Sequence, residues 1–424
     1  MKKFLIIGSG GREHALAWKI GVEGDARKVF VAPGNDGIAN DSDIDVECVD
    51  IDVGDFESLA DFAEQKSLDL TVVGPEAPLC DGIVDFFDER DLPIFGPRAA
   101  AARLEGSKSF AKDLMTDAGV PTAEYEVFED VEAAKNYVDR VDHPVAIKAD
   151  GLAGGKGVVI SEDRDQSRET LVEYMKAERF GDASTRVVIE ECLFGEEMSF
   201  IVVSDGERVA PLATSRDHKR IGEGDTGPNT GGMGAVAPAP GVTGDLEREV
   251  METVISPVLD EIQSGGTSYR GFLYAGLMLT DDGPKVLEFN CRMGDPEAQP
   301  LLFASEADLG SVLIEAARGN LPSDIDLRTD RHACCVVLAS GGYPAPDRDT
   351  GHEVHGLDAA ADIAETKIFH AGTRMEDDHF INAGGRVLGV TGRGITHRQA
   401  RQRAYEAASR INWPGMHYRR DIGE

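Results

Sequence analysis

In the first hundred residues, apolar runs alternate with stretches whose apolar positions recur at a helical spacing. The runs FLIIG, KVFVA and LDLTVVG have the composition of buried strands, and helical patterns lie at 16–20 and 58–64. Two further apolar runs, IVDFF and LPIFG, follow before residue 104. Strands that alternate with helices are typical of a parallel sheet covered by helices. The pattern therefore predicts an N-terminal Rossmann-like parallel α/β domain over residues 1–104.

The pattern changes twice further along the chain. Residues 105–325 mix strands and helices, which predicts an α+β domain with a smaller lid subdomain at about 122–192. From 326 to 424, short runs such as ACCVVLA and RVLGVTG predict a β-rich domain. One closing helix there carries Ala404, Ala407 and Ala408 on its apolar face. The expected fold class is thus multidomain, with α/β and α+β parts.

A glycine-rich segment separates two predicted strands of the second domain. The strand at 144–149 carries Lys148, and the strand at 158–160 follows a short loop. The loop contains Gly151, Gly154, Gly155, Lys156 and Gly157. With so few side chains, backbone N–H groups can close over a polyphosphate, and the two lysines offset its charge. The spacing differs from the GxxxxGK(S/T) loop, so we predict a nucleotide lid of hairpin form; the alternative is a flexible surface hairpin.

A second glycine cluster follows the first strand and opens the first helix. Gly10 and Gly11 precede Arg12 and Glu13 in GSGGREH. A helix N-terminus beside an arginine predicts a phosphate site, and the alternative is a tight strand-to-helix turn. The dinucleotide fingerprint GxGxxG is not met, because Glu13 stands at its third glycine and the strand at 28–32 ends without a ribose-binding acid. The sequence therefore disfavours a hydride-transferring dehydrogenase.

The segment VLEFNCR at 286–292 predicts a metal and phosphoryl-transfer site. At the two-residue period of a strand, Glu288, Asn290 and Arg292 share one face, and apolar residues occupy the other. Two oxygen ligands at this spacing suit Mg²⁺, and the arginine can stabilise charge on a transferring phosphoryl group. Asp295 follows as a further acid. The alternative, a charged exposed edge strand, fits poorly with so apolar an opposite face.

Three further segments are rich in groups that bind substrates. Lys108 lies at a predicted helix start after the cap Ser107, where a bound phosphate would explain a lysine that opposes the helix dipole. The strand at 186–191 ends in Glu190 and Glu191 and can offer backbone groups to an adenine. The polar, glycine-rich excursion at 214–234 supplies Asp217 for an amino group, Lys219 for a phosphate, and the loop residues Asn229, Gly231 and Gly232. The sequence shows neither a Ser/His/Asp triad nor an HExxH helix, so it does not support a triad hydrolase or an HExxH metalloprotease.

Charge narrows the range of partners. The 424 residues carry 77 acidic and 43 basic side chains, and the formal net charge of −34 is spread along the chain. The negative electrostatic field of such a chain would repel nucleic acid and anionic membranes, which argues against them as partners. We also expect adaptation to high salt, where counterions screen the repulsion between the acidic side chains. No apolar run is long enough to span a membrane and no leader precedes the first strand, which predicts a soluble, cytoplasmic protein. The six cysteines lack metal-ligand spacing and are expected as free thiols.

Together these motifs resemble the ATP-grasp superfamily, and most closely its glycinamide ribonucleotide synthetase (phosphoribosylamine–glycine ligase) family. The similarity extends over essentially the whole chain, through GSGGREHALAW, LEGSKSFAKD, IKADGLAGGKGV, TSRDHKR, DTGPNTGGMGA and EFNCRMGDPE. The resemblance implies a central ATP-grasp domain and a ligase of purine biosynthesis. Such a ligase uses ATP to convert glycine to glycyl phosphate, which 5-phosphoribosylamine captures. We therefore expect ATP and Mg²⁺ (or Mn²⁺) as cofactors and small molecules as the other substrates. We also expect the protein to be a monomer.

The resemblance also implies roles for individual residues. Lys108 and Lys148 match the nucleotide-phosphate lysines, and the lid is 151–157. The adenine hinge would be Glu190, Glu191 and Leu193, the ribose acid Glu197, the Mg²⁺ ligands Glu288 and Asn290, and the residue facing the acyl phosphate Arg292. With Arg292, Asp217 and Asp295 complete the predicted catalytic set. The 5-phosphate of the ribosylamine is expected either at the helix start that includes Gly10, Gly11, Arg12 and Glu13 or at the 216–234 loop.

Three points stay open at this level. The strand at 274–279 carries no second metal carboxylate, so the number of metal ions is undetermined. A ligase for a different acid and amine is one alternative, which the motifs GREHA and DHKR disfavour. A nucleotide-binding regulator without activity is another, which the intact Lys148, Glu288, Asn290 and Arg292 disfavour.

Overall fold

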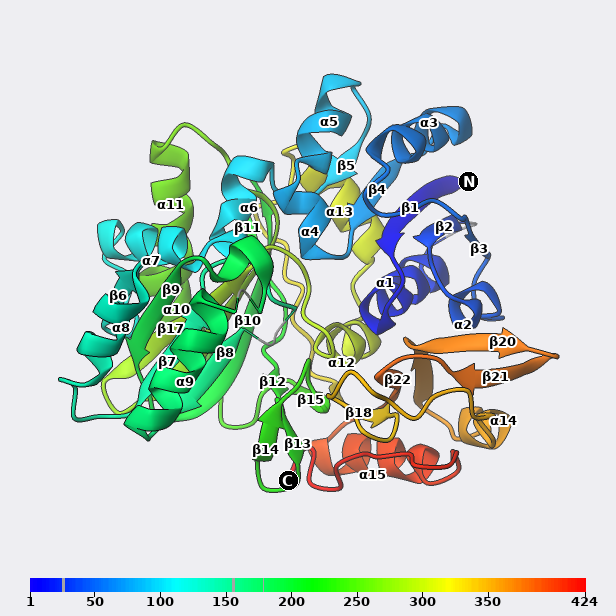
Figure 1. Ribbon diagram of the computed structural model, residues 1–424. Coiled ribbons are helices and arrows are strands. Elements are labelled where there is room, and N and C mark those ends of the chain that lie inside the picture. The colour runs from blue at the N-terminus through cyan, green and yellow to red at the C-terminus, as the bar shows by residue number, and fades with distance from the viewer. Residues whose placement is uncertain (25–26, 155–156, 178) are drawn as a thin grey trace.

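The computed structural model describes residues 1–24, 27–154, 157–177 and 179–424, and its N-terminal part is a five-stranded parallel sheet (Figure 1). The strand order is β3-β2-β1-β4-β5, which confirms the predicted parallel α/β architecture. The strands are β1 (Lys2–Gly8), β2 (Arg27–Pro33), β3 (Val46–Cys48), β4 (Leu70–Val73) and β5 (Ile94–Phe95). Residues 4–7 of β1 are completely buried because helices cover both faces of the sheet, which explains a continuous apolar run rather than an alternating one.

Helices join and cover these strands. They are α1 (Gly11–Val22), α2 (Asp36–Ala39), α3 (Phe56–Lys66), α4 (Glu76–Cys80), α5 (Ile83–Glu89) and α6 (Ala99–Gly106). The apolar run IVDFF therefore belongs to a helix, since Ile83, Val84 and Phe87 recur at helical spacing on its buried face. The first glycine cluster lies where predicted, between the end of β1 and the start of α1.

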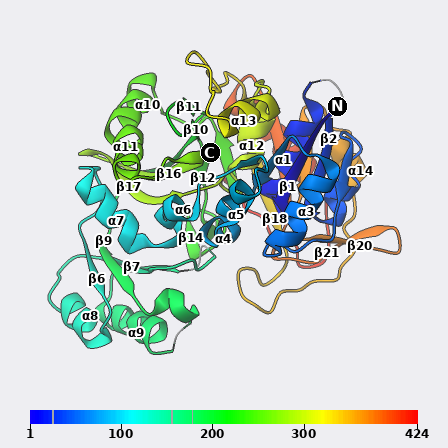
Figure 2. The same ribbon diagram turned by 90° about the horizontal axis from the view of Figure 1, so that it is seen from above.

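The central part contains two four-stranded sheets, and the lid sheet projects away from the rest of the molecule (Figure 2). The lid sheet has the order β6-β9-β7-β8, with strands Tyr125–Phe128, Val187–Glu191, Val145–Ala149 and Val158–Ser161. Its helices are α8 (Val131–Val138) and α9 (Arg164–Met175), and a 3₁₀ turn lies at Gly181–Ser184. These elements enclose a hydrophobic cluster of their own. The antiparallel β7–β8 pair confirms that the glycine-rich segment is the turn of a hairpin.

The second central sheet forms the floor below the lid. Its order is β11-β10-β16-β17, with strands Val209–Pro211, Glu196–Asp205, Arg270–Thr280 and Gly283–Asn290. The helices of this part are α7 (Lys108–Asp117), α10 (Gly244–Val250), α11 (Ser256–Ser264), α12 (Ala298–Ala304) and α13 (Leu309–Ala317), with a π-helical segment at Met251–Ile255. Ser107 caps α7 by accepting from the N–H of Phe110, as its position before Lys108 predicts.

The C-terminal part is a sheet that also takes strands from the middle of the chain. Its order is β12-β15-β18-β22-β19, with strands Arg216–Asp217, Gly234–Ala237, His332–Ala339, Arg386–Gly394 and Thr366–His370. The helices are α14 (Leu357–Ala361) and α15 (His397–Ala408), and β20 (Thr373–Glu376) and β21 (His379–Asn382) form a hairpin. By chain position β12 and β15 lie within residues 105–325, yet β15 pairs with β18. The polar excursion at 214–234 is therefore built on the C-terminal sheet.

Between β12 and β15 the excursion forms a small hairpin of β13 (Arg220–Gly222) and β14 (Thr226–Asn229), seen at the bottom of Figure 1. The six cysteines are free, as expected. Within the part of the chain that the structure describes, no helix combines the length and the apolar character needed to cross a membrane.

Candidate active site

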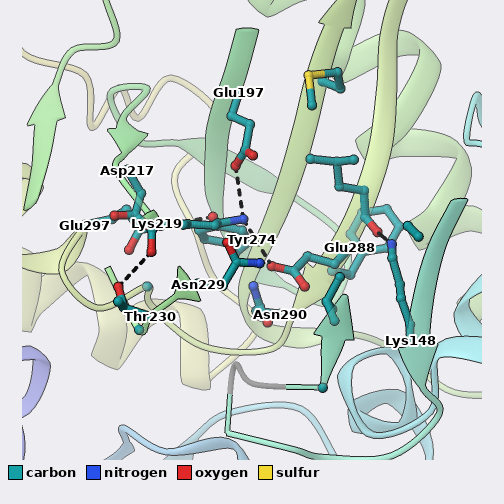
Figure 3. A pocket seen from close by; sticks show the side chains of 18 of the residues that line it. Lys148, Glu197, Asp217, Lys219, Asn229, Thr230, Tyr274, Glu288, Asn290 and Glu297 are labelled. Carbon is teal, nitrogen blue, oxygen red and sulfur yellow. Dashed lines mark hydrogen bonds and ion pairs between the residues drawn. The ribbon is translucent and has the colours of Figure 1, made fainter. Parts of the chain in front are cut away.

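A cavity of about 870 Å³ lies between the floor sheet, the lid sheet and the C-terminal sheet. Most of the predicted site residues line it, although they come from distant parts of the sequence (Figure 3). They are Arg12, Lys108, Lys148, Gly154, Gly157, Glu190, Glu191, Leu193, Glu197, Asp217, Lys219, Asn229, Gly231, Glu288, Asn290, Arg292 and Asp295. The cavity is thus lined by residues from all six of the segments that the sequence singles out.

The remaining predicted residues lie beside the cavity or outside the description. Gly10, Gly11, Glu13 and Gly232 are not part of the cavity wall among the described residues. Gly155 and Lys156 lie outside the described residues. Gly232 has a φ of +108°, and a Cβ there would lie 2.7 Å from Oδ1 of Asp217. Its glycine therefore permits a close backbone approach to a site residue.

The glycine turn before α1 is closed by its own glutamate. Oε2 of Glu13 accepts from the N–H of Gly10 at 2.6 Å, and Oε1 accepts from Nε of Arg12 at 2.6 Å. The Glu13 side chain is buried, so it serves the turn as a capping group. Arg12 also donates to the carbonyl of Met293 at 3.3 Å and reaches the cavity wall. Of this motif, the arginine is the group that the structure brings to the cavity.

At the lid end, one buried carboxylate holds two lysines. Nζ of Lys148 lies 2.8 Å from Oε1 of Glu190, and Nζ of Lys112 lies 2.9 Å from Oε2. Lys148 also donates to the carbonyl of Leu287 at 3.0 Å. Burial, helped by the charge of Lys148, lowers the pKa of Lys112 to about 8, although Glu190 opposes this shift. Both carboxylate oxygens of Glu190 are therefore paired with lysines. The predicted contact of Glu190 with an adenine would be made by its backbone.

Lys112 was not singled out in the sequence, and its spacing could have identified it. It lies four residues after Lys108 on α7, so both lysines project from the same face of that helix. Burial lowers the pKa of Lys108, and the charge of Lys148 adds to this effect. Asp150 at the start of the lid loop accepts from the N–H of Ser109 at 2.6 Å and so provides a negative charge at the N-terminus of α7.

Glu288 and Asn290 project into the cavity from the end of β17, as the strand period predicts. Burial alone would raise the pKa of Glu288, but Lys219, Lys108 and Lys148 hold it at about 2, so the carboxylate is ionised. Oxygen donors of this kind fit a hard divalent cation. No cluster of three metal-binding side chains occurs in the described ranges of the chain.

Arg292 follows β17 and is held by two acids from the N-terminal side of the cavity. Its Nη2 lies 2.8 Å from Oε1 of Glu105, and its Nε lies 3.3 Å from Oε2 of Glu76. The N–H of Cys291 donates to Glu105 at 2.6 Å. Burial raises the pKa of Glu105, and the guanidinium of Arg292 opposes that shift. Both acids are isolated in the sequence, and no local pattern marks them as partners of Arg292.

Two carboxylates, Asp217 and Glu297, lie together at the opposite end of the cavity (Figure 3). Burial raises the pKa of Asp217 well above its usual range, and the neighbouring charge of Glu297 raises it further. Glu297 accepts from the hydroxyl of Tyr274 at 2.9 Å and from that of Ser199 at 3.3 Å. Oδ1 of Asp217 is buried and has no hydrogen-bond partner among the described residues. An incoming ammonium group would satisfy this oxygen.

Between the two ends, Lys219 and Asp295 are both paired. Nζ of Lys219 lies 3.1 Å from Oε2 of Glu197 and 3.7 Å from Oε1 of Glu288. Oδ2 of Asp295 lies 3.1 Å from Nη2 of Arg386, and Oδ1 accepts from the amide of Gln299 at 2.9 Å. Burial would raise the pKa of the Asp295 carboxyl, but Arg386 holds it below its usual range. Arg386 comes from β22, so the C-terminal sheet contributes directly to the cavity.

Comparison with known proteins gives a consistent result along the chain. Residues 2–105, 106–298 and 333–424 match the N domain, the ATP-grasp (A) domain and the C domain of phosphoribosylglycinamide synthetase. The phosphoribosylamine–glycine ligases of Allochromatium vinosum and Escherichia coli O157:H7 are 51% and 48% identical to this chain. Both alignments cover 99% of this chain and 98% of the relative.

Solved structures agree with the sequence comparison. The phosphoribosylamine–glycine ligase of Thermotoga maritima superposes with a TM-score of 0.84 at 34% identity, over 99% of this chain and 100% of that one. The biotin carboxylase domain of the Hydrogenobacter thermophilus 2-oxoglutarate carboxylase has a TM-score of 0.73 at 17% identity, over 98% and 91% of the two chains, and shares the fold. The chain therefore belongs to the phosphoribosylglycinamide synthetase family and has its N, ATP-grasp and C domains.

Proposed function

We propose that this protein ligates glycine to 5-phosphoribosylamine with consumption of ATP, yielding glycinamide ribonucleotide, ADP and phosphate. One observation carries the proposal: a single cavity joins a lysine-rich end under a glycine lid to a two-carboxylate end suited to an amino group. The first end fits a nucleotide triphosphate and the second a small amino acid. The names of the full-length relatives support the same reaction.

The lysine end would bind the phosphates of ATP. Lys108 and Lys148 come from α7 and β7 and line the same cavity, so both can approach one polyphosphate. Gly154 and Gly157 of the lid turn also line the cavity and permit close approach of the backbone. The hydrophobic cluster of the lid is separate from that of the floor sheet, so the lid can close as a unit and exclude water.

Glu288 and Asn290 would hold Mg²⁺ (or Mn²⁺) beside the phosphates. Their oxygen donors and the ionised state of Glu288 suit this role. A bound cation supplies charge neutralisation to the transferring phosphoryl group. Arg292, held in place by Glu105 and Glu76, adds a fixed positive charge to the same part of the cavity.

The carboxylate end would bind and orient the amino acid. Asp217 has an unsatisfied buried oxygen that can accept from the ammonium of glycine, and Glu297 is a second carboxyl group nearby. This contact would direct the glycine carboxylate toward the phosphate end. There it would take the γ-phosphoryl group and become glycyl phosphate, and the amine of the ribosylamine would displace phosphate from that intermediate. The attacking amine is already free, so the site needs to position it rather than to activate it strongly.

The proposal is tested by ADP release in roughly molar KCl with Mg²⁺ and glycine, with and without freshly generated phosphoribosylamine. Release that requires both substrates is the expected result. Release with glycine alone would indicate hydrolysis of the acyl phosphate. Release only with another acid and amine would contradict the substrate assignment and move the protein to a sister reaction.

The location of the ribosylamine phosphate is tested by two variants. Arg12 from α1 and Arg220 from the β13–β14 hairpin both reach the cavity. Arg12→Gln and Arg220→Gln are compared for their KM values for the ribosylamine. The variant with the larger increase identifies the phosphate site, and a rise in the KM for ATP instead would place that arginine at the nucleotide.

A further inference from the structure

The β13–β14 hairpin reaches the cavity but has little structure of its own. Arg220, Asp225 and Asn229 of this hairpin line the cavity wall. Its two strands comprise residues 220–222 and 226–229, all of them exposed or half-buried. An isolated two-stranded ribbon is marginally stable in water. Whatever fixes the hairpin therefore decides the geometry of this wall.

The end of the chain supplies the contacts that fix it. The side chain of Arg419 is only 1% exposed, and its Nη1 donates to Oδ1 of Asp225 at 2.7 Å and to the carbonyl of Arg220 at 3.0 Å. Its other edge is paired with Asp421, through Nε to Oδ1 at 2.8 Å and Nη2 to Oδ2 at 2.7 Å. The planar guanidinium thus donates two hydrogen bonds to the hairpin and two to Asp421 in its own segment, all with defined directions.

Further contacts between the terminus and the hairpin follow the same path. Oδ2 of Asp421 accepts from the N–H of Gly224 at 2.8 Å, at the tip of the hairpin. His417 contacts the carbonyl of Ile221 through Nε2 at 2.9 Å. The strand β13 and the turn of the hairpin are therefore attached to residues 417–421.

The terminus is itself anchored in the C-terminal core. Ile422 is completely buried in the cluster beneath α15. The hydroxyl of Tyr405, on α15, donates to the carbonyl of Arg419 at 2.9 Å and accepts from the N–H of Ile422 at 3.0 Å. A rigid helix thus holds the segment that holds the hairpin.

We propose that Arg419 is a positioning residue for the amine substrates: its buried guanidinium links Asp225 of the β13–β14 hairpin to Asp421 and so fixes the hairpin against the cavity. The inference rests on the proposed function, and it gives the last residues of the chain a part in substrate affinity. The nucleotide end is built from α7, β7 and β9, so the bridge affects the amine substrates and leaves ATP binding in place.

The test compares Arg419→Gln and Arg419→Lys with a matched control, Arg27→Gln. Arg27 is also a buried arginine, 3% exposed, whose Nη2 lies 2.7 Å from Oδ1 of Asp308, but it lies outside the cavity wall. We expect Arg419→Gln to raise the KM for glycine or the ribosylamine about tenfold and the KM for ATP less than about twofold. Arg419→Lys should recover only part of the loss, because lysine cannot bridge both aspartates with a planar fork. Arg27→Gln should lower the melting temperature and leave all KM values unchanged.

Hydrogen exchange gives an independent readout that does not depend on turnover. The amides of 220–229 should exchange faster in Arg419→Gln than in the wild type, while those of β7 and β9 stay unchanged. If Arg419→Gln does not fold, Asp421→Asn removes one side of the same bridge and serves in its place. Equal changes in the KM for ATP and for the amine substrates, or unchanged exchange at 220–229, would overturn the proposal. Failure of wild-type turnover with glycine and the ribosylamine would instead contradict the proposed function alone.

Discussion

Lys148 and Glu190 form a buried ion pair between neighbouring strands of the lid sheet, and Lys112 reaches the second oxygen of the same carboxylate. The single carboxylate of Glu190 is thus paired with two lysine side chains. When Lys148 turns to a nucleotide phosphate, Lys112 keeps Glu190 neutralised, so no unpaired buried carboxylate remains. The arrangement lets Lys148 move toward a nucleotide phosphate without leaving the buried Glu190 carboxylate unpaired.

Lys112→Met should weaken nucleotide binding although Lys112 need not touch the nucleotide. In this variant Lys148 is the remaining partner of Glu190, and moving it toward a phosphate would leave that carboxylate unpaired. We expect the dissociation constant of a non-hydrolysable ATP analogue to rise about tenfold, or ~1.4 kcal/mol, in a calorimetric titration.

The control for this prediction is Lys135→Met. Lys135 lies 3.1 Å from Glu132 in an exposed pair on α8, and exposed pairs contribute little to stability. This variant should bind the analogue as the wild type does. Unchanged affinity in a folded Lys112→Met protein would contradict the shared-carboxylate account.

Arg292→Ala should abolish turnover while ATP still binds, because the fixed charge near the transferring phosphoryl group is lost. The change also leaves the buried Glu105 without its partner 2.8 Å away, which should cost about 3 kcal/mol of stability. The double variant Arg292→Ala with Glu105→Gln separates these effects. It should regain most of the stability, measured by urea unfolding, and none of the turnover. Near-normal turnover in either variant would contradict the role of Arg292.

Local patterns in the sequence were sufficient for much of this architecture. The buried run in β1, the Ser107 cap and the two-residue period of Glu288 and Asn290 depend on neighbours a few residues away, so each is visible in sequence. The resemblance of whole motifs then identified the family, which the comparisons confirm. Domain boundaries and the roles of the site residues stay predictions.

The parts that were missed depend on tertiary contacts. Glu105 lies 187 positions before the arginine it holds, and Tyr274 donates to Glu297 from 23 positions away, so neither pairing leaves a periodic signal. The incorporation of β12 and β15 into the C-terminal sheet is of the same kind. A short strand such as GAVA is fully buried whichever sheet receives it, and its own residues do not specify the partner.

Stability should fall on mild acidification because of His370. Burial, reinforced by the charge of His14, lowers the pKa of His370 to about 3, below the value near 6.5 of an unfolded histidine. Below pH 6.5 the unfolded chain therefore binds more protons than the folded one. The contribution of the neutral, buried His370 to the free energy of unfolding is complete above that pH and is lost as the pH falls. The loss is about 1.4 kcal/mol for each pH unit between 6.5 and the folded pKa.

His370→Gln should reduce the slope of unfolding free energy against pH between pH 6.5 and 5 by that amount. Asp41, whose pKa is held low by His14 and Lys367 against the effect of burial, titrates below this window and does not interfere. His379→Gln, at an exposed position on β21, is the control and should leave the slope unchanged. Equal slopes in wild type and His370→Gln would show that His370 is not the titrating group.

Salt should stabilise the protein by screening its net charge of −34. Self-repulsion destabilises a compact state that carries so many like charges, and the Debye length falls from about 10 Å at 0.1 M to about 3 Å at 1 M salt. The melting temperature should therefore rise steeply with KCl and level off near ~1 M, where screening is nearly complete. Sucrose, which is excluded from protein surfaces but does not screen charge, separates the two causes of stabilisation. A melting temperature that does not change with KCl, or that rises equally with sucrose, would contradict the prediction that salt stabilises this protein by charge screening.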